Sequence, residues 1–233
     1  MQNKKVVVLT GSGISAESGL STFRDSGGLW EGYNVNEVAS IDGWKVNPKK
    51  VLDFYNLRRE QAALSSPNDA HLALKLFEVK YDVIIITQNI DALHEKAGSS
   101  KVIHLHGELT KARSENNPKE VIEIGNRQIH LNDLSKDGSQ LRPNIVWFGE
   151  MVPMIEIAIE ELATADYFIV IGTSLSVYPA ANLIHYVNSE ISKVIIDPAK
   201  PDVLLSSDWK HIKKKAVLGV PELVKDLLNK DIV

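Results

Sequence analysis

The feature that most constrains the fold of this chain is a short apolar strand followed directly by a turn with spaced glycines. Val6–Leu9 is apolar throughout, and Thr10–Asp25 follows it as TGSGISAESGLSTFRD. This order is typical of a parallel strand that ends at a phosphate-binding turn, where glycines bring the backbone close to the anion and the next helix start offers N–H groups. Ser15 and Ala16 stand where a dinucleotide fingerprint would carry its third glycine, so the turn alone is weak evidence.

Further apolar runs are rich in Val and Ile and hydrophobic on both faces, which favours central strands of a parallel sheet covered on both sides. These predicted strands are Val6–Leu9, Val83–Ile86, Val102–Leu105, Ile145–Phe148, Tyr167–Ile171 and Val194–Ile196. Helical patterns lie between them: His71–Val79, with Leu72, Leu76 and Val79 on one face, Met154–Ala163, Ala180–Val187 and a helix that starts at Pro221. The alternation predicts an α/β fold with a Rossmann-like, doubly wound parallel sheet.

Two stretches interrupt the alternation and predict a second, smaller domain. Trp30–Ser65 is mostly helical in pattern, whereas Leu109–Leu141 is polar and rich in turn residues. We expect a Rossmann-like domain of residues 1–30, 80–108 and 142–233, and a small domain of residues 31–79 and 109–141. Within the second insertion, a partly alternating set of apolar residues predicts a hairpin around Gly125–Asn126: Val121, Ile122, Ile124, Ile129 and Leu131.

Composition excludes several classes of partner. Lys and Arg number 26 against 30 Asp and Glu, a net charge of -4, which argues against a nucleic-acid surface. No apolar run approaches the roughly 18–20 residues that span a bilayer, and the chain enters its first strand too early for a signal peptide. Cysteine is absent, so no disulfide or thiol site is possible. We expect a cytoplasmic monomer that binds neither nucleic acid nor membrane.

Five sequence blocks, taken in order, resemble the signatures of the sirtuins, the NAD-dependent protein deacylases. They are Thr10–Asp25, Gln88–Asp91, His104–Gly107, Arg142–Glu150 and Gly172–Ala181. The resemblance covers nearly the whole chain. It implies that NAD is a reactant: the acyl oxygen of an acyl-lysine in a protein or peptide attacks the ribosyl carbon as nicotinamide leaves. The products would be free lysine, nicotinamide and O-acyl-ADP-ribose.

The resemblance also assigns site residues. His106 would be the catalytic base, since an imidazole titrates near neutral pH, and Asn89 would act with it. The segment that carries Val146, Phe148, Gly149 and Glu150 would pair with an extended substrate peptide. The residues implied to bind NAD are Gly11, Ser12, Gly13, Ser15, Ala16, Phe23, Arg24, Trp30, Gln88, Asn89, Ile90, Asp91, Gly172, Thr173, Ser174, Asp197 and Ala216. His104 and the remaining histidines are interpreted as structural.

Tyr55 and Arg58 suggest which acyl group is removed. They are spaced i, i+3 in a helical pattern, so their side chains share one face. A guanidinium beside a phenol suits a carboxylate. The pair resembles the signature of sirtuins that remove succinyl, malonyl or glutaryl groups, so we expect a preference for acidic acyl groups. Arg59 should point elsewhere.

Most sirtuins hold a structural zinc between two pairs of cysteines in the second insertion. Aligned from the flanking blocks, the four positions are occupied here by Ser114, Asn117, Leu134 and Asp137. None supplies a thiolate, and a tetrahedral zinc site needs four ligands in close geometry. We therefore predict no zinc, as in a zinc-less form of the desuccinylase and demalonylase type.

Three other functions stay open at this point. The chain could be a protein deacetylase without an acidic-acyl preference. It could be a mono-ADP-ribosyltransferase that uses the same NAD site, or a non-catalytic NAD-binding module. The missing third glycine disfavours a dehydrogenase that transfers hydride.

Overall fold

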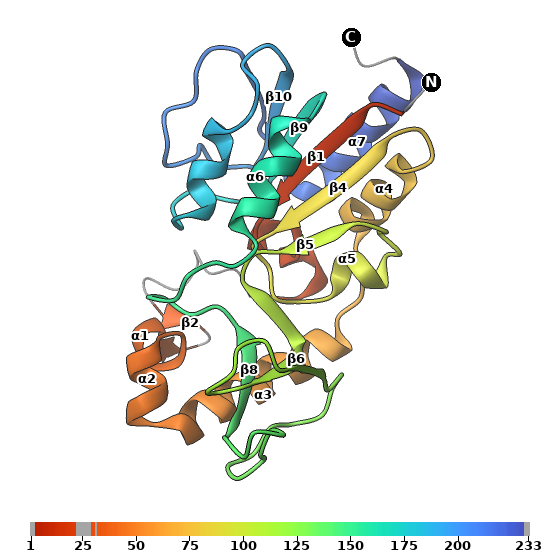
Figure 1. The fold of residues 1–233 in the computed structure, drawn as a ribbon. Coiled ribbons are helices and arrows are strands. Elements are labelled where there is room, and N and C mark those ends of the chain that lie inside the picture. Colours follow the sequence, from red (N-terminus) through yellow and green to blue (C-terminus); the bar gives the residue numbers. More distant parts are fainter. Residues whose placement is uncertain (1–2, 22–28, 31, 231–233) are drawn as a thin grey trace.

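The larger part of the molecule is a six-stranded sheet in which all pairs are parallel (Figure 1). The computed structural model describes residues 3–21, 29–30 and 32–230. The strand order is β11-β10-β9-β1-β4-β5. The strands are β1 (Lys5–Thr10), β4 (Asp82–Thr87), β5 (Val102–His104), β9 (Tyr167–Ile171), β10 (Ser192–Ile196) and β11 (Trp209–Ile212). The predicted Rossmann-like fold class is therefore confirmed, whereas the boundaries of the two domains stay a prediction.

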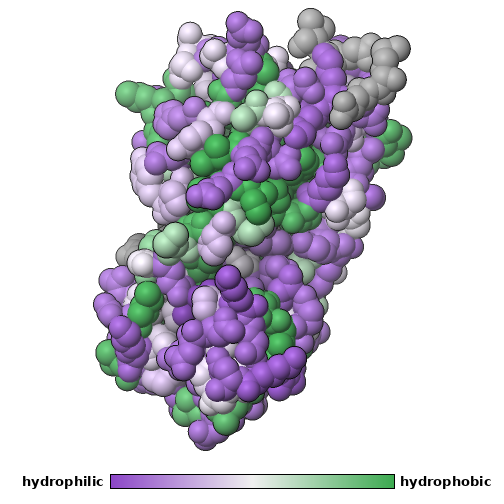
Figure 2. All heavy atoms as spheres, viewed as in Figure 1, coloured by the Kyte–Doolittle hydropathy of each residue, from purple (hydrophilic) through white to green (hydrophobic). Residues whose placement is uncertain are grey.

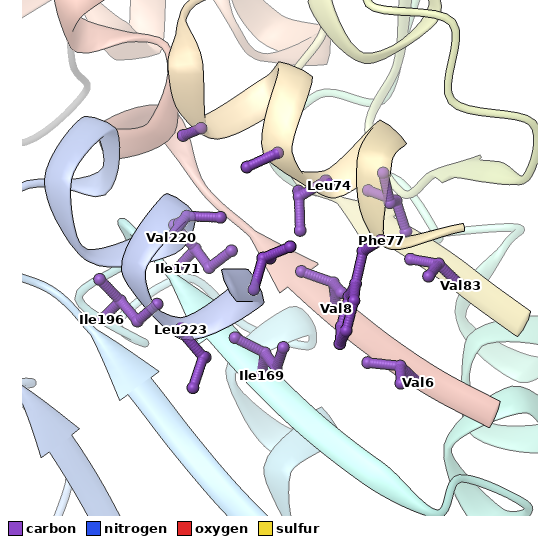
Figure 3. Packing of buried hydrophobic residues seen from close by; sticks show 14 of the residues in the cluster. Val6, Val8, Leu74, Phe77, Val83, Ile169, Ile171, Ile196, Val220 and Leu223 are labelled. Atoms are coloured by element: carbon purple, nitrogen blue, oxygen red, sulfur yellow. The ribbon is translucent and has the colours of Figure 1, made fainter. Parts of the chain in front are cut away.

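Helices cover both faces of the sheet, which explains why its strands are apolar on both sides. On one face, α4 (Asp69–Phe77) and α7 (Ala216–Asn229) pack over Val6 and Val8 of β1 (Figure 3). On the other face, Val7 of β1 lies in a second core with α6 (Ile155–Ala163) and the 3₁₀ helix η4 (Ala180–His185). Alternate residues of one strand thus enter different cores.

Two of the helix predictions need correction. The apolar face predicted from Leu72, Leu76 and Val79 is exposed, and α4 buries Leu74 and Phe77 instead. The spacing of the apolar residues is helical, but α4 packs against α7 with the neighbouring face of the helix.

The last helix also starts earlier than predicted. It begins at Ala216, so Pro221 lies inside it rather than at its first position. Ala216 and Val220 of α7 are buried in the core that α7 shares with α4 and the sheet, and this packing outweighs the hydrogen bond that proline cannot donate.

The predicted strand Ile145–Phe148 is not part of the parallel sheet. Its first residue ends β8 (Leu141–Ile145), which pairs with β6 (Gly107–Ser114) in a three-stranded antiparallel sheet of order β7-β6-β8. The hairpin around Gly125–Asn126 is also wrong, because β7 (Val121–Glu123) turns back onto β6. An apolar run shows that a segment is buried but does not identify its partner strand.

The smaller part combines this antiparallel sheet with helices of the first insertion: α1 (Val35–Val38), α2 (Ile41–Val46) and α3 (Pro48–Leu64). Trp44, Phe54, Tyr55 and Trp147 are buried in its core. The remaining short elements are β2 (Leu29–Trp30), β3 (Tyr33–Asn34) and α5 (Leu93–Lys96). The outline of the molecule narrows between the larger and the smaller part (Figure 2).

Hydrogen bonds join three of the four positions at which most sirtuins carry zinc ligands. The Ser114 hydroxyl donates to Asp137 Oδ2 at 2.6 Å and accepts from the backbone N–H of Asn117 at 2.9 Å. Ser139 Oγ lies 2.8 Å from the same hydroxyl, whereas Leu134 is exposed. These hydrogen bonds hold the end of β6 by neutral and charged oxygens rather than by thiolates.

We expect Ser114→Ala to lower the free energy of unfolding by about 1–3 kcal/mol, because it removes the hydroxyl that donates to the Asp137 carboxylate and accepts from two backbone N–H groups. Denaturant unfolding followed by circular dichroism measures this loss. Ser189→Ala, at an exposed serine, should change stability by less than about 0.5 kcal/mol. An equal, small change in both variants would contradict a stabilising role for Ser114.

Candidate active site

A cavity of about 600 Å³ lies at the carboxyl ends of β1, β4, β9 and β10 and is also lined by residues of the smaller part. Ligands of open α/β sheets bind at this edge. Every predicted site residue that the structure describes lines this cavity: Gly11, Ser12, Gly13, Ser15, Ala16, Trp30, Tyr55, Arg58, Gln88, Asn89, Ile90, Asp91, His106, Val146, Phe148, Gly149, Glu150, Gly172, Thr173, Ser174, Asp197 and Ala216. Phe23 and Arg24 lie outside the described residues.

The glycines of the first turn bring it into contact with the turn after β9. The N–H groups of Gly11 and Gly13 are donated to the carbonyls of Ile171 at 3.0 Å and Gly172 at 2.9 Å. A Cβ on Gly13 would lie 2.7 Å from Gly172 Cα. The expected long helix start is also absent here, since two 3₁₀ turns follow. The glycines therefore allow two backbone turns to touch, and these two N–H groups are not left for a phosphate.

The loop after β4 is attached to both of these turns. Asn89 Nδ2 donates to Ser15 Oγ at 3.1 Å, and Gln88 Nε2 donates to Thr173 Oγ1 at 3.1 Å. Asp91 accepts from Ser15 Oγ and from the N–H of Leu93. Burial raises the pKa of Asp91, although both hydrogen bonds lower it. These polar side chains are thus fixed at the cavity wall.

His106 has the tautomer that a general base requires. Its Nδ1 lies 2.9 Å from the carbonyl oxygen of Gln88. A carbonyl only accepts, so Nδ1 carries the proton and Nε2 keeps its lone pair. Burial lowers the pKa of His106, and the bond to Gln88 offsets this only in part. The imidazole is therefore neutral near pH 7 and able to take a proton.

Tyr55 and Arg58 lie at the end of the cavity that belongs to the smaller part. The Tyr55 hydroxyl accepts from Trp147 Nε1 at 3.1 Å, and burial raises its pKa well above the usual value. Arg58 is 5% exposed, lies 5.3 Å from the ring centre of Trp30 and donates from Nη1 to Gln61. Arg59 points away, as predicted, to the carbonyl of Leu109.

The segment from Val146 to Glu150 is already hydrogen-bonded within the protein. The N–H groups of Val146 and Phe148 are donated to the carbonyls of His106 and Ala39. The Glu150 carboxylate binds Arg113, Arg142 and the N–H of Trp147. Peptide pairing along this segment would have to use other backbone groups, and Glu150 positions the segment from beneath.

The cavity also involves residues that were not singled out from the sequence. Trp147 lies within a matched block, so its neighbours Val146 and Phe148 were a usable signal. Lys215 lines the cavity and pairs with Glu17 at 3.2 Å, a contact between segments about 200 residues apart that no local pattern indicates. Among the described residues, no group of three or more His, Asp or Glu is placed to hold a metal ion.

Gly172→Ala tests the contact between the two turns. Gly172 has a φ of +61, and a Cβ there would lie 2.5 Å from the backbone nitrogen of Ile14. Gly125 has a similar φ of +56 but open space around it, so Gly125→Ala is a matched control. Both variants should lose about 1–2 kcal/mol from the left-handed backbone.

Gly172→Ala should lose about 1–3 kcal/mol more than the control, because its methyl group overpacks the turn. Equilibrium unfolding of the two variants measures the difference. Equal losses would show that the turns tolerate a side chain.

Comparison with known proteins gives a single family. The Sir2 family model matches residues 11–179. A protein from Helicobacter pylori, named NAD-dependent protein deacylase, is 51% identical over 226 residues, which are 97% of this chain and 98% of that protein. A relative of the same name from Bacteroides thetaiotaomicron is 49% identical over 230 residues, 97% of this chain and 98% of its own length.

Solved structures agree with the sequence relatives. A Sir2 homolog–NAD complex has a TM-score of 0.85 at 38% identity, covering 97% of this chain and 90% of that one. Sir2 bound to acetylated peptide has a TM-score of 0.76 at 29% identity, covering 97% of this chain and 93% of that one.

Within the described residues, no helix is long and apolar enough to cross a membrane. Because the family model and the sequence relatives both match, the chain belongs to the Sir2 family.

Proposed function

We propose that this chain is an NAD-dependent protein-lysine deacylase that prefers acyl groups ending in a carboxylate, such as succinyl or malonyl. The deacylase class follows from the family and from the names of its relatives. The preference is our inference, and one observation carries it: Tyr55 and Arg58 line the same cavity as His106.

The cavity has groups that fit NAD. The Asp197 carboxylate, at the end of β10, is 5% exposed and suits ribose hydroxyls, while Thr173 and Ser174 offer small polar side chains. Bound NAD supplies an electrophilic ribosyl carbon and nicotinamide as leaving group. His106 Nε2 is then available to take a proton from a ribose hydroxyl, and Asn89 is held by Ser15 beside it.

The acyl end of the cavity favours a negative charge. Arg58 is almost fully buried, and a guanidinium in such surroundings forms strong, often bidentate, bonds to a carboxylate. Tyr55 accepts from Trp147, which leaves the hydroxyl's own proton to donate to a further acceptor. An acetyl group offers neither interaction, so it should bind this end less well.

Matched peptides that differ only in succinyl- or acetyl-lysine test the preference. We expect Arg58→Met to lower kcat/KM for the succinyl peptide about 10- to 100-fold, as the loss of a charged hydrogen bond predicts. Turnover of the acetyl peptide should change by less than about threefold. Mass spectrometry of both peptides, with and without NAD, gives the two rates.

Arg127→Met is the matched control, because it removes an exposed arginine from the same part of the molecule. Turnover that favours the acetyl peptide in the wild type would leave a deacetylase without acidic preference. NAD-derived label that stays on protein would indicate an ADP-ribosyltransferase instead.

The pH dependence of kcat/KM tests His106 as base. A base must be unprotonated to act, and the pKa of His106 lies below the usual 6.5. Activity should therefore be constant near neutral pH and fall on acidification with a midpoint below 6.5. His130→Gln, which replaces an exposed histidine, should keep the acidic fall in kcat/KM. A midpoint of this fall above 6.5 in the wild type would exclude His106 as the base.

A further inference from the structure

His104 lies two residues before the candidate base, yet it has contacts that a purely structural histidine would not need. We propose that His104 and Glu95 form a charged pair that positions the Asn89 loop for catalysis, and that loss of the His104 proton sets the alkaline limit of activity. His104 is thus a positioning residue. Its kinetic test rests on the proposed deacylase function, but its spectroscopic test does not.

Two histidines at the end of β5 bind successive carbonyls of the loop after β4. His106 Nδ1 lies 2.9 Å from the oxygen of Gln88, and His104 Nδ1 lies 3.1 Å from the oxygen of Asn89. The two histidines are separated by one residue, and the Nδ1 atoms of both rings contact the same loop. The peptide plane of Asn89, whose side chain lines the cavity, is therefore oriented by His104.

The partners of His104 determine its charge. The Asn89 carbonyl can only accept, so Nδ1 must carry a proton. Nε2 lies 2.7 Å from Glu95 Oε1, and a carboxylate also only accepts. Both ring nitrogens donate, which makes the ring an imidazolium with its side chain 7% exposed.

The surroundings stabilise this charge. Burial alone would lower the pKa of His104, but the hydrogen bond and charge of Glu95 raise it above 6.5. Burial would raise the pKa of Glu95, but the bond from His104 lowers it, so the carboxylate stays ionised. The charged or titratable groups that act on the pair come from four neighbouring segments: His71 on α4, Asp91 after β4, His94 beside Glu95 on α5, and Glu108 and Lys111 on β6.

His106 provides an internal comparison. It makes the same Nδ1 bond to a carbonyl, but among the residues that the structure describes its Nε2 has no carboxylate partner, and burial lowers its pKa. At the end of β5, His106 is thus neutral and His104 is positively charged. The difference arises because Glu95 binds the Nε2 of His104.

The sign of the pH effect follows from the raised pKa. The pair stabilises the loop fully below the ordinary pKa of 6.5, and this contribution is lost as pH rises through the higher pKa of folded His104. The lost proton is the one on Nε2, because Nδ1–H still has its carbonyl. The Nε2 lone pair then faces the Glu95 carboxylate, and the pair separates. Activity should therefore fall on the alkaline side.

Glu95→Gln tests the charge without removing the contact. The amide N–H of the new side chain can donate to Nε2 of a neutral His104, which keeps its Nδ1–H bond to Asn89. We expect the alkaline fall in kcat/KM to disappear in this variant. Glu123→Gln is the matched control, since it removes another carboxylate that faces Lys111, and it should keep the fall.

Substitutions of His104 separate positioning from general destabilisation. His104→Phe removes both donors and should lower kcat/KM for NAD about tenfold, as the loss of one hydrogen bond predicts. His104→Gln retains one N–H that can reach Asn89, so it should recover most of this loss. Equal losses in the two variants would overturn the positioning role.

NMR of isotope-labelled histidine gives a readout that does not need activity. In the wild type, the titration midpoint of His104 should lie above 6.5, and both ring nitrogens should be protonated below that midpoint. In Glu95→Gln the midpoint should fall below that of the wild type. A midpoint below 6.5 in the wild type, or an alkaline fall that persists in Glu95→Gln, would falsify the proposal.

Discussion

The contact between two glycine turns is the constraint on which the rest of the site depends. The N–H of Gly13 reaches the carbonyl of Gly172 at 2.9 Å, which draws together the ends of β1 and β9. Side chains next to these glycines then reach the third loop: Ser15 accepts from Asn89, and Thr173 accepts from Gln88. The loop after β4 is therefore hydrogen-bonded to both turns. Any widening of the contact would displace both of its polar side chains at once.

The charge of each buried histidine near the site is set by its hydrogen-bond partner as well as by its burial. His104 and His106 are both largely buried at one strand end, and both donate from Nδ1 to a carbonyl. Burial lowers the pKa of each, but within the described part of the chain only His104 has a carboxylate partner that reverses the shift. His94, buried without such a partner, has a pKa well below its usual value. Charge is therefore placed beneath the loop, while the cavity side keeps a neutral imidazole.

The sequence predicted what depends on local pattern and on the family signature. Apolar runs on both faces identified β1, β4, β9 and β10, whose burial needs no knowledge of neighbours. In contrast, β11 reads Trp-Lys-His-Ile and was missed, because its polar residues tolerate the sheet edge. The site residues and their expected roles came from the resemblance, but the hydrogen bonds that hold these residues in place did not. The acceptors of the Gly11 and Gly13 N–H groups lie about 160 residues away, so no local pattern could reveal them.

Charged side chains connect the small antiparallel sheet to the wall of the cavity. Arg113 and Arg142 are paired across β6 and β8, and both bind the carboxylate of Glu150. Glu150 in turn accepts from the N–H of Trp147, whose ring N–H binds Tyr55. Ser114, the next residue after Arg113, is hydrogen-bonded to Asp137, Ser139 and the N–H of Asn117. These bonds hold the end of β6 next to Arg113, and Arg113 reaches Trp147 of the cavity wall through Glu150.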